Sequence, residues 1–214
     1  MKIGFYCESP ADQAARAVIA EGILGQPPEP ISMDLAAHGV TSIFSALDGV
    51  FRGVHYHSDA EALVVVIDCD DTALHDPAHD TPGGDEEDCR LCQARKIIDR
   101  ARRQLKPRKA LPALKVAIGL AVPAIEAWYL VGKEHQVGEA AWRAGLAAGR
   151  PPFTRPQLKE LVYGKDRPSL ERLRECAVTE ARRIISNVRA IEDAFPAGFG
   201  LMAQEVRSWT AAAT

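Results

Sequence analysis

The residues best suited to chemistry stand at the end of an apolar stretch, VVVIDCDD, at positions 64–71. Side chains alternate along a strand, so Asp68 and Asp70 are expected on one side and Cys69 on the other. Carboxylates held close together repel one another unless they are protonated or neutralised. A hard divalent cation, Mg²⁺ or Mn²⁺, neutralises them through oxygen ligands. The stretch therefore predicts a cation site.

Three further acids are expected at the same edge. Glu8 directly follows the apolar stretch 3–7, and Asp12 falls in the first turn of the helix that comes next. Glu126 comes four residues after the stretch 114–122. Ligands of open parallel sheets bind beyond the carboxyl ends of the strands. A metal held there would activate water and stabilise charge on a phosphate oxygen. The alternative is that each acid caps a turn or helix, or is solvated.

A second group has the composition of a zinc site. His75, His79, Cys89 and Cys92 supply two imidazoles and two thiols, the stoichiometry of a tetrahedral structural zinc centre. Zinc would hold a long polar loop that has little apolar material of its own. The alternative is a pair of surface histidines and two half-buried thiols.

Charge is segregated along the chain. Residues 68–88 contain nine acids and no Lys or Arg, whereas 90–115 contain ten basic residues and one acid. One side of the expected helix carries Arg95, Arg102 and Lys106, with Arg103 close by. Such a stripe of basic side chains could contact a phosphate backbone. The alternative is an ordinary solvated helix face.

Strands and helices must position these acids, cysteines and histidines. The spacing of the apolar residues predicts an α/β fold. Strands are expected at 3–7, 31–35, 62–68 and 114–122, and helices at 11–24, 40–51, 90–105 and 123–132. Strands that are apolar on both faces and alternate with helices predict a mostly parallel sheet flanked by helices over residues 1–132, with the acidic Cys/His loop at 70–92.

From residue 133 the strand patterns stop. Helical patterns occupy 155–163, 169–195 and 198–209. Residues 133–214 are therefore expected to form a helical C-terminal region packed on the sheet.

Composition narrows the class further. The chain has 214 residues, 47% of them apolar, which is enough for a packed core. Its formal charge of −3 identifies no partner. We expect no signal peptide and no membrane span, because every long apolar stretch is interrupted by charge or proline. Five cysteines, an odd number, are typical of a reduced cytoplasmic protein.

The order of the acids resembles a Toprim domain, in which a strand ending in Glu precedes a strand ending in Asp-x-Asp. The spacing of Glu8 and Asp12 is similar to the Glu-x-x-x-Asp of OLD-type nucleases. The segment AIEAWYL at 124–130 and the C-terminal pattern YGKDRPSLERL to FPAGFG resemble a Toprim-like family, domain of unknown function 4276. One departure is that Ser9 and Pro10 follow Glu8, where Toprim domains often have glycine.

The resemblance implies a metal-dependent nuclease acting on DNA or RNA. By this resemblance Glu8, Asp68 and Asp70 are the catalytic and metal-binding residues, while Asp12 and Glu126 support a second metal. Lys165 is implied as a cation near the substrate. Relatives often work beside an ATPase in bacterial anti-phage defence, which implies an ABC or OLD-type ATPase partner.

Two other functions remain open at this point. The chain could be a non-catalytic Toprim-fold subunit that acts as an interaction module in an ATPase-containing complex. It could also carry out metal-dependent chemistry on a small phosphorylated ligand, which the absence of a strong basic excess allows.

Overall fold

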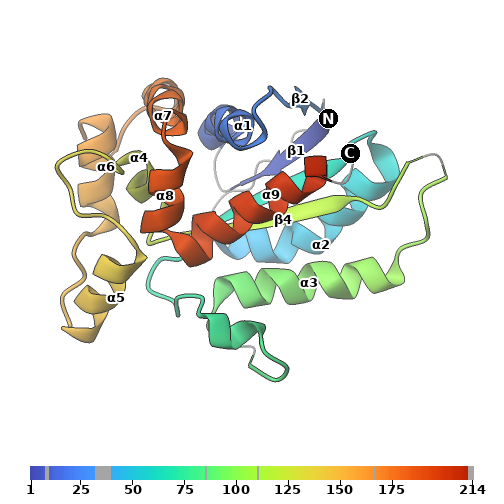
Figure 1. Cartoon of the computed structure of the whole chain (residues 1–214), viewed down its shortest axis with the longest axis horizontal. Coiled ribbons are helices and arrows are strands. Elements are labelled where there is room, and N and C mark those ends of the chain that lie inside the picture. Colours follow the sequence, from blue (N-terminus) through green and yellow to red (C-terminus); the bar gives the residue numbers. More distant parts are fainter. Residues whose placement is uncertain (8–9, 32–39, 85, 110, 166, 212–214) are drawn as a thin grey trace.

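A computed structural model describes residues 1–7, 10–31, 40–84, 86–109, 111–165 and 167–211. Within these residues the chain forms one parallel sheet with the strand order β2-β1-β3-β4 (Figure 1). The strands are β1 (Lys2–Tyr6), β2 (Glu29–Pro30), β3 (Ala62–Asp68) and β4 (Lys115–Ala121). The fold is therefore mixed α/β, with parallel strands flanked by helices, as the sequence predicts.

The second strand differs from expectation. It spans Glu29–Pro30 rather than 31–35, and 32–35 lie outside the described residues. Proline has no N–H to donate to a neighbouring strand, and the segment from 27 to 30 contains three prolines. The strand therefore stays short, and β2 only borders β1.

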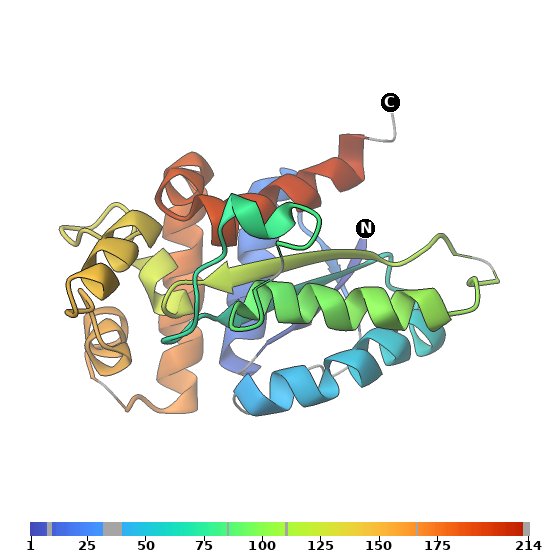
Figure 2. The ribbon, with the colours of Figure 1, turned by 90° about the horizontal axis from the view of Figure 1, so that it is seen from below.

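Two helical layers cover the sheet (Figure 2). The helices α1 (Pro10–Leu24) and α9 (Leu201–Ala211) lie on one face, and α2 (Val40–His57) and α3 (Arg90–Gln104) lie on the other. In β3, Val64 and Val66 join the first layer, whereas Val65 and Ile67 join the second. This explains the continuous apolar run: each side of the strand meets a helix.

The C-terminal region is helical throughout its regular elements. These elements are α4 (Ile125–Tyr129), α5 (Glu139–Ala147), α6 (Arg155–Tyr163), α7 (Leu170–Ile185), α8 (Val188–Ala194) and a π-helical turn (Pro196–Gly200) that leads into α9. They share the hydrophobic core of the sheet, and α7 packs along α1. At this crossing a Cβ on Gly22 would lie 2.6 Å from Cβ of Ile185, so the close approach requires glycine.

Two helical predictions need correction. The run expected at 169–195 divides into α7 and α8 because the Asn187 side chain accepts a hydrogen bond from the Ala190 N–H and starts a new helix. The helix expected at 123–132 shortens to the five residues of α4.

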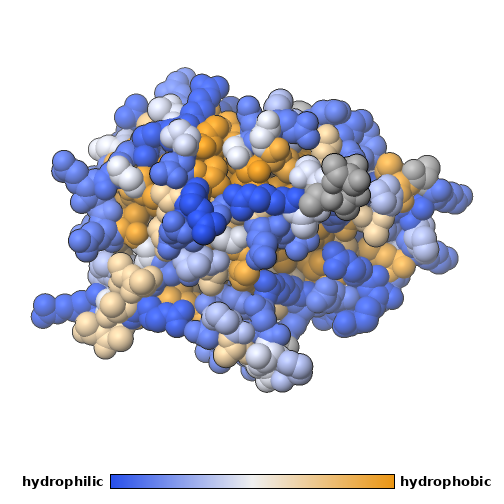
Figure 3. Space-filling view, in the orientation of Figure 1, coloured by the Kyte–Doolittle hydropathy of each residue, from blue (hydrophilic) through white to orange (hydrophobic). Residues whose placement is uncertain are grey.

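The surface is mixed in character. In the space-filling view, hydrophilic side chains break the hydrophobic surface into small areas (Figure 3). Among the described residues, no helix is both long enough and apolar enough to cross a membrane.

A buried carboxylate joins α5 to the start of the last helix. Glu139 accepts hydrogen bonds from the N–H groups of Ala197 (3.1 Å) and Gly198 (2.6 Å). Gly198 lies so close to β4 that a Cβ there would be 2.0 Å from the Leu120 carbonyl oxygen. Burial raises the pKa of Glu139, and the two N–H groups oppose that shift. The FPAGFG segment is therefore a packing motif that fastens the C-terminal helix to the sheet.

We expect Glu139→Gln to lower the free energy of unfolding by about 1–3 kcal/mol. A glutamine has one carbonyl oxygen, so its amide group would face one of the two N–H donors. Urea unfolding measures the loss. Glu134→Gln, at an exposed position, is the matched control and should leave the midpoint unchanged. Equal stability of the two variants would show that Glu139 does not hold this junction.

Candidate active site and metal centre

Asp68 ends β3 in register with Ala121, the last residue of β4. Its side chain is buried, and Oδ1 accepts a hydrogen bond of 3.1 Å from the N–H of Ile125. Ile125 is the first residue of α4, so this carboxylate receives one of the N–H groups that a helix start leaves unpaired. The acid thus also has a structural role at the carboxyl edge of the sheet.

Asp70 occupies a backbone conformation that few residues adopt. Its φ is 49°, in the left-handed region that Asp and Asn tolerate better than most side chains. Its N–H donates to the Pro123 carbonyl oxygen at 2.8 Å, which continues the pairing of the β3 end with the segment after β4. The backbone turns at Asp70. The carboxylates of Asp68 and Asp70 still lie near each other, because one guanidinium, that of Arg155, bonds to both.

Two arginines neutralise this acidic edge, meaning the carboxylates of Asp68 and Asp70. Arg155 donates from Nη2 to Asp68 Oδ2 and from Nη1 to Asp70 Oδ1, each at 2.5 Å. Arg90 donates from Nη1 to Asp70 Oδ2 and to the Asp68 carbonyl oxygen, each at 2.6 Å. The mutual repulsion of the two acids is therefore relieved within the protein by cations from α6 and α3.

A third arginine lies buried near the same edge. Burial lowers the pKa of Arg16 to about 10, and the nearby Asp68 and Glu126 are among the groups that oppose this shift. Glu126 is itself buried, in the first turn of α4. It thus lies near the acidic edge, as expected, but as one of the countercharges around a buried guanidinium.

A hollow of about 570 Å³ lies beside the acidic edge. Asp70, Arg90 and Arg155 line its charged side, and Trp142 and Phe153 are among the apolar residues around it. Cationic and anionic groups thus border one cavity. Such a cavity suits an anionic ligand together with a cation.

Two of the expected acids are not placed. Glu8 lies outside the described residues, and the side chain of Asp12 is not described, although its backbone belongs to α1. Asp68, Asp70 and Glu126 are therefore the predicted acids whose positions are known.

The four Cys and His residues predicted for zinc come together. One potential ligand atom from each of His75, His79, Cys89 and Cys92 lies within 4.8 Å of every other. His75 Nδ1 is 3.6 Å from Cys89 Sγ and 3.7 Å from Cys92 Sγ, and His79 Nδ1 is 3.7 Å from Cys92 Sγ. Tetrahedral ligands at zinc distances lie about 3.6 Å apart. This cluster could bind a metal ion, and we call it the metal centre.

Local structure explains how the metal centre forms. A 3₁₀ turn at Pro77–Asp80, capped by the Asp76 side chain, reverses the chain between the two histidines. Cys89 is the N-cap of α3 and Cys92 lies in its first turn, a common half-site geometry. Burial raises the pKa of Cys89 to about 11 and lowers that of His75. A bound cation would offset the cost of ionising the thiol.

The residues predicted to contact a nucleic acid differ in their surroundings. Arg95 lies beside the metal centre, where it donates to Asp80 at 2.5 Å. Arg102 Nη1 lies 3.6 Å from Asp99 Oδ1, and Arg102 Cζ lies 6.0 Å from the centre of the Phe51 ring. Arg103, Lys106 and Lys165 are exposed.

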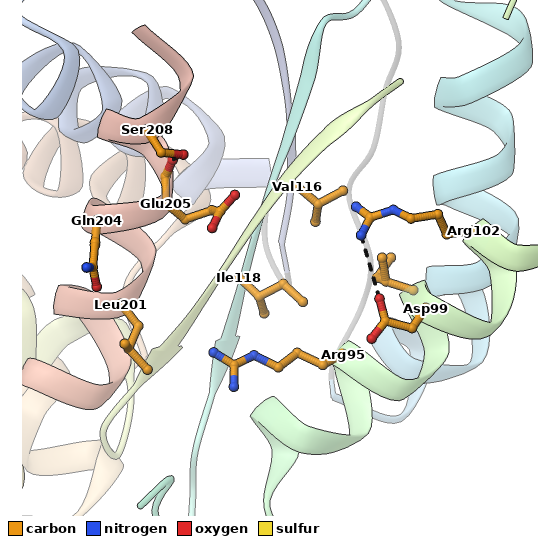
Figure 4. A pocket seen from close by; sticks show the side chains of 10 residues that line it. Arg95, Asp99, Arg102, Val116, Ile118, Leu201, Gln204, Glu205 and Ser208 are labelled. Carbon is orange, nitrogen blue, oxygen red and sulfur yellow. Dashed lines mark hydrogen bonds and ion pairs between the residues drawn. The ribbon is translucent and has the colours of Figure 1, made fainter. Parts of the chain in front are cut away.

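Arg95 and Arg102 also border a groove of about 380 Å³ between α3 and α9, next to β4 (Figure 4). Glu205 on α9 faces them across it. Because the groove carries both signs of charge, it does not form a basic track for a phosphate backbone.

The residues that the sequence did not predict at the acidic edge are Arg16, Arg90 and Arg155. Arg155 is 85 residues from Asp70 along the chain, and no spacing pattern connects them. Arg90 directly follows Cys89, so a metal centre at Cys89 and Cys92 was the one signal that could have located it.

Comparisons with protein-family models, curated proteins and solved structures found no match. The acidic edge and the metal centre are therefore the features from which a function can be inferred.

We expect Asp68→Asn to lower the free energy of unfolding by about 3 kcal/mol or more, because it leaves buried positive charge without its counterion. Asp70→Asn should cost less, since the Asp70 side chain is 20% exposed against 8% for Asp68. Urea unfolding of both variants makes the comparison. A larger loss for Asp70→Asn would contradict this ranking.

Proposed function

We propose that the protein is a Toprim-like, metal-dependent nuclease that hydrolyses phosphodiester bonds in DNA or RNA. The observation that carries the proposal is the acidic edge: two carboxylates at the carboxyl end of a parallel strand, bonded to two arginines, with Asp70, Arg90 and Arg155 lining one hollow. Carboxylates bind a hard cation and arginines bind phosphate, which together are the groups that phosphoryl transfer needs.

The donor atoms suit Mg²⁺ or Mn²⁺. Asp68 and Asp70 offer carboxylate oxygens, which these ions prefer, and Glu8, Asp12 and Glu126 are the further candidates from the family resemblance. Such an ion would supply positive charge to the phosphate oxygens and lower the pKa of a water nucleophile. Asp68 Oδ1 is fixed by the Ile125 N–H, so this carboxylate is oriented in advance.

The arginines would change partners when substrate binds. Arg155 is 38% exposed at the start of α6, and its planar guanidinium already makes two parallel hydrogen bonds to oxygen anions. A phosphate presents the same pair of acceptors. Arg155 would then bind the phosphate, while Arg90 keeps Asp70 in place.

The nucleic-acid substrate and an ATPase partner in anti-phage defence follow from the family resemblance. The exposed Arg102, Arg103, Lys106 and Lys165 remain candidates for contacts with the polymer.

One observation favours a second function, a non-catalytic interaction module. Arg155 and Arg90 already satisfy both carboxylates, and Asp68 supports the start of α4. In that role the acidic edge, paired with its two arginines, would join the sheet to the helical region without a metal ion.

For the metal centre we propose zinc in a structural role. The donor set of two nitrogens and two sulfurs supports this identity, as do the nitrogen–sulfur separations of 3.6–3.7 Å from His75 to both cysteines and from His79 to Cys92. Cys89 and Cys92 flank the segment that carries Arg90, so zinc would also hold Arg90 against the acidic edge.

The first test is cleavage of plasmid, single-stranded DNA and bulk tRNA with Mg²⁺, Mn²⁺ or EDTA. Asp70→Asn should reduce metal-dependent cleavage by about 100-fold or more, because an essential charge at the reacting centre is lost. Asparagine is chosen because it tolerates the left-handed backbone at this position.

Asp59→Asn is the control, since Asp59 is an exposed carboxylate paired with Lys2 at the opposite, amino end of the strands. Its activity should equal that of the wild type. Full activity of a folded Asp70→Asn would exclude the acidic edge as the reaction site. Absence of cleavage by the wild type on all three polymers would favour the interaction module.

Elemental analysis should find about one zinc per chain in protein never exposed to a chelator, as a closed four-ligand site requires. Cys92→Ser should lower that content, whereas Cys176→Ser, which alters a cysteine outside the cluster, should not. Equal zinc in both variants would contradict the assignment.

A further inference from the structure

The two ring nitrogens of His75 face different neighbours. Nδ1 points to the thiols of Cys89 and Cys92, as a metal ligand would. Nε2 lies 3.3 Å from the carboxylate of Asp80 and 3.4 Å from Nη1 of Arg95. His75 is buried, so these contacts largely define the environment of its ring.

The two neighbours of Nε2 favour opposite tautomers. A neutral imidazole carries one proton, and the nitrogen without it is the one able to bind a metal. Asp80 accepts a hydrogen bond, so it favours the proton on Nε2 and leaves Nδ1 free to ligate. Arg95 only donates, so alone it would favour the proton on Nδ1 and block ligation.

The distances show how this competition is decided. Arg95 Nη1 is 2.5 Å from Asp80 Oδ1 but 3.4 Å from His75 Nε2, so the carboxylate is the stronger partner of the guanidinium. Asp80 therefore draws the arginine toward Oδ1, while its other oxygen, Oδ2, can accept from the ring. Arg95 in turn fixes the position of a carboxylate that is otherwise about half exposed.

We propose that Asp80 and Arg95 are positioning residues of the metal centre, in which Asp80 selects the tautomer of His75 that presents Nδ1 to the metal. A histidine that binds a metal commonly donates its other N–H to a carboxylate, and this partner orients the ring. The proposal goes beyond the hydrolysis described above and does not depend on it. It also gives Arg95 a role within the protein rather than at a nucleic acid.

Selection of the tautomer by Asp80 predicts an effect on metal affinity that a general loosening of the loop would not produce. Asp80→Ala removes the acceptor and frees Arg95 to donate to Nε2, which favours the tautomer unable to bind metal. Adding Arg95→Ala then removes that competing donor. The double variant should therefore bind metal more tightly than Asp80→Ala alone.

The experiment is a titration of the full chain, prepared without metal, with Zn²⁺ against a chelating dye and with Co²⁺ by its visible absorption. Asp80→Ala should weaken binding by 10- to 100-fold, the range for loss of such a partner. Arg95→Ala should weaken it less. The double variant should recover part of the affinity lost in Asp80→Ala, and all should keep the Co²⁺ spectrum of a tetrahedral site once saturated.

Glu87→Ala is the matched control. Glu87 lies in the same loop and is exposed, but no hydrogen bond joins its side chain to the His75 ring among the described contacts. It should weaken binding less than Asp80→Ala does. Equal losses, or a double variant no tighter than Asp80→Ala, would overturn the proposal. A wild-type chain that binds neither ion would instead remove the metal centre itself.

Discussion

The structure depends on the compensation of charge at the carboxyl edge of the sheet. Asp68 and Asp70 follow a strand buried on both faces, where unpaired carboxylates would oppose folding. Arg155 from the helical region and Arg90 from α3 supply the countercharge. The same contacts tie α6 to the end of β3. A single electrostatic requirement therefore holds together elements that are far apart in sequence.

The metal centre and the acidic edge are two ends of one loop. The chain leaves β3 at Asp68, passes through both histidines and returns at Cys89 and Arg90, which bonds back to Asp70. The loop has a short 3₁₀ turn as its only regular helix or strand in the described part, so cross-links must hold it. The clustered Cys and His side chains at one end and an ion pair at the other stand where apolar packing orders the chain elsewhere.

Residues of the acidic edge that stabilise the fold lie beside the hollow. Asp68 orients the start of α4, and Arg155 neutralises the acids while its guanidinium lines the hollow. These groups are held by several partners at once. Charged residues concentrated in this way, beside a cavity, are characteristic of functional sites.

The sequence by itself determined the parallel α/β framework, the helical C-terminal region and the four members of the metal centre. Apolar periodicity and ligand spacing are local properties that a chain carries in its order of residues. Only the tertiary structure decided which cations meet the acids, that Arg95 and Asp80 lie beside His75, and that Glu139 fastens the last helix. These contacts join segments separated by 15 to 87 residues, and their pairing depends on how helices pack against the sheet. No local pattern encodes that packing, because many arginines along the chain have the same charge and only geometry distinguishes them.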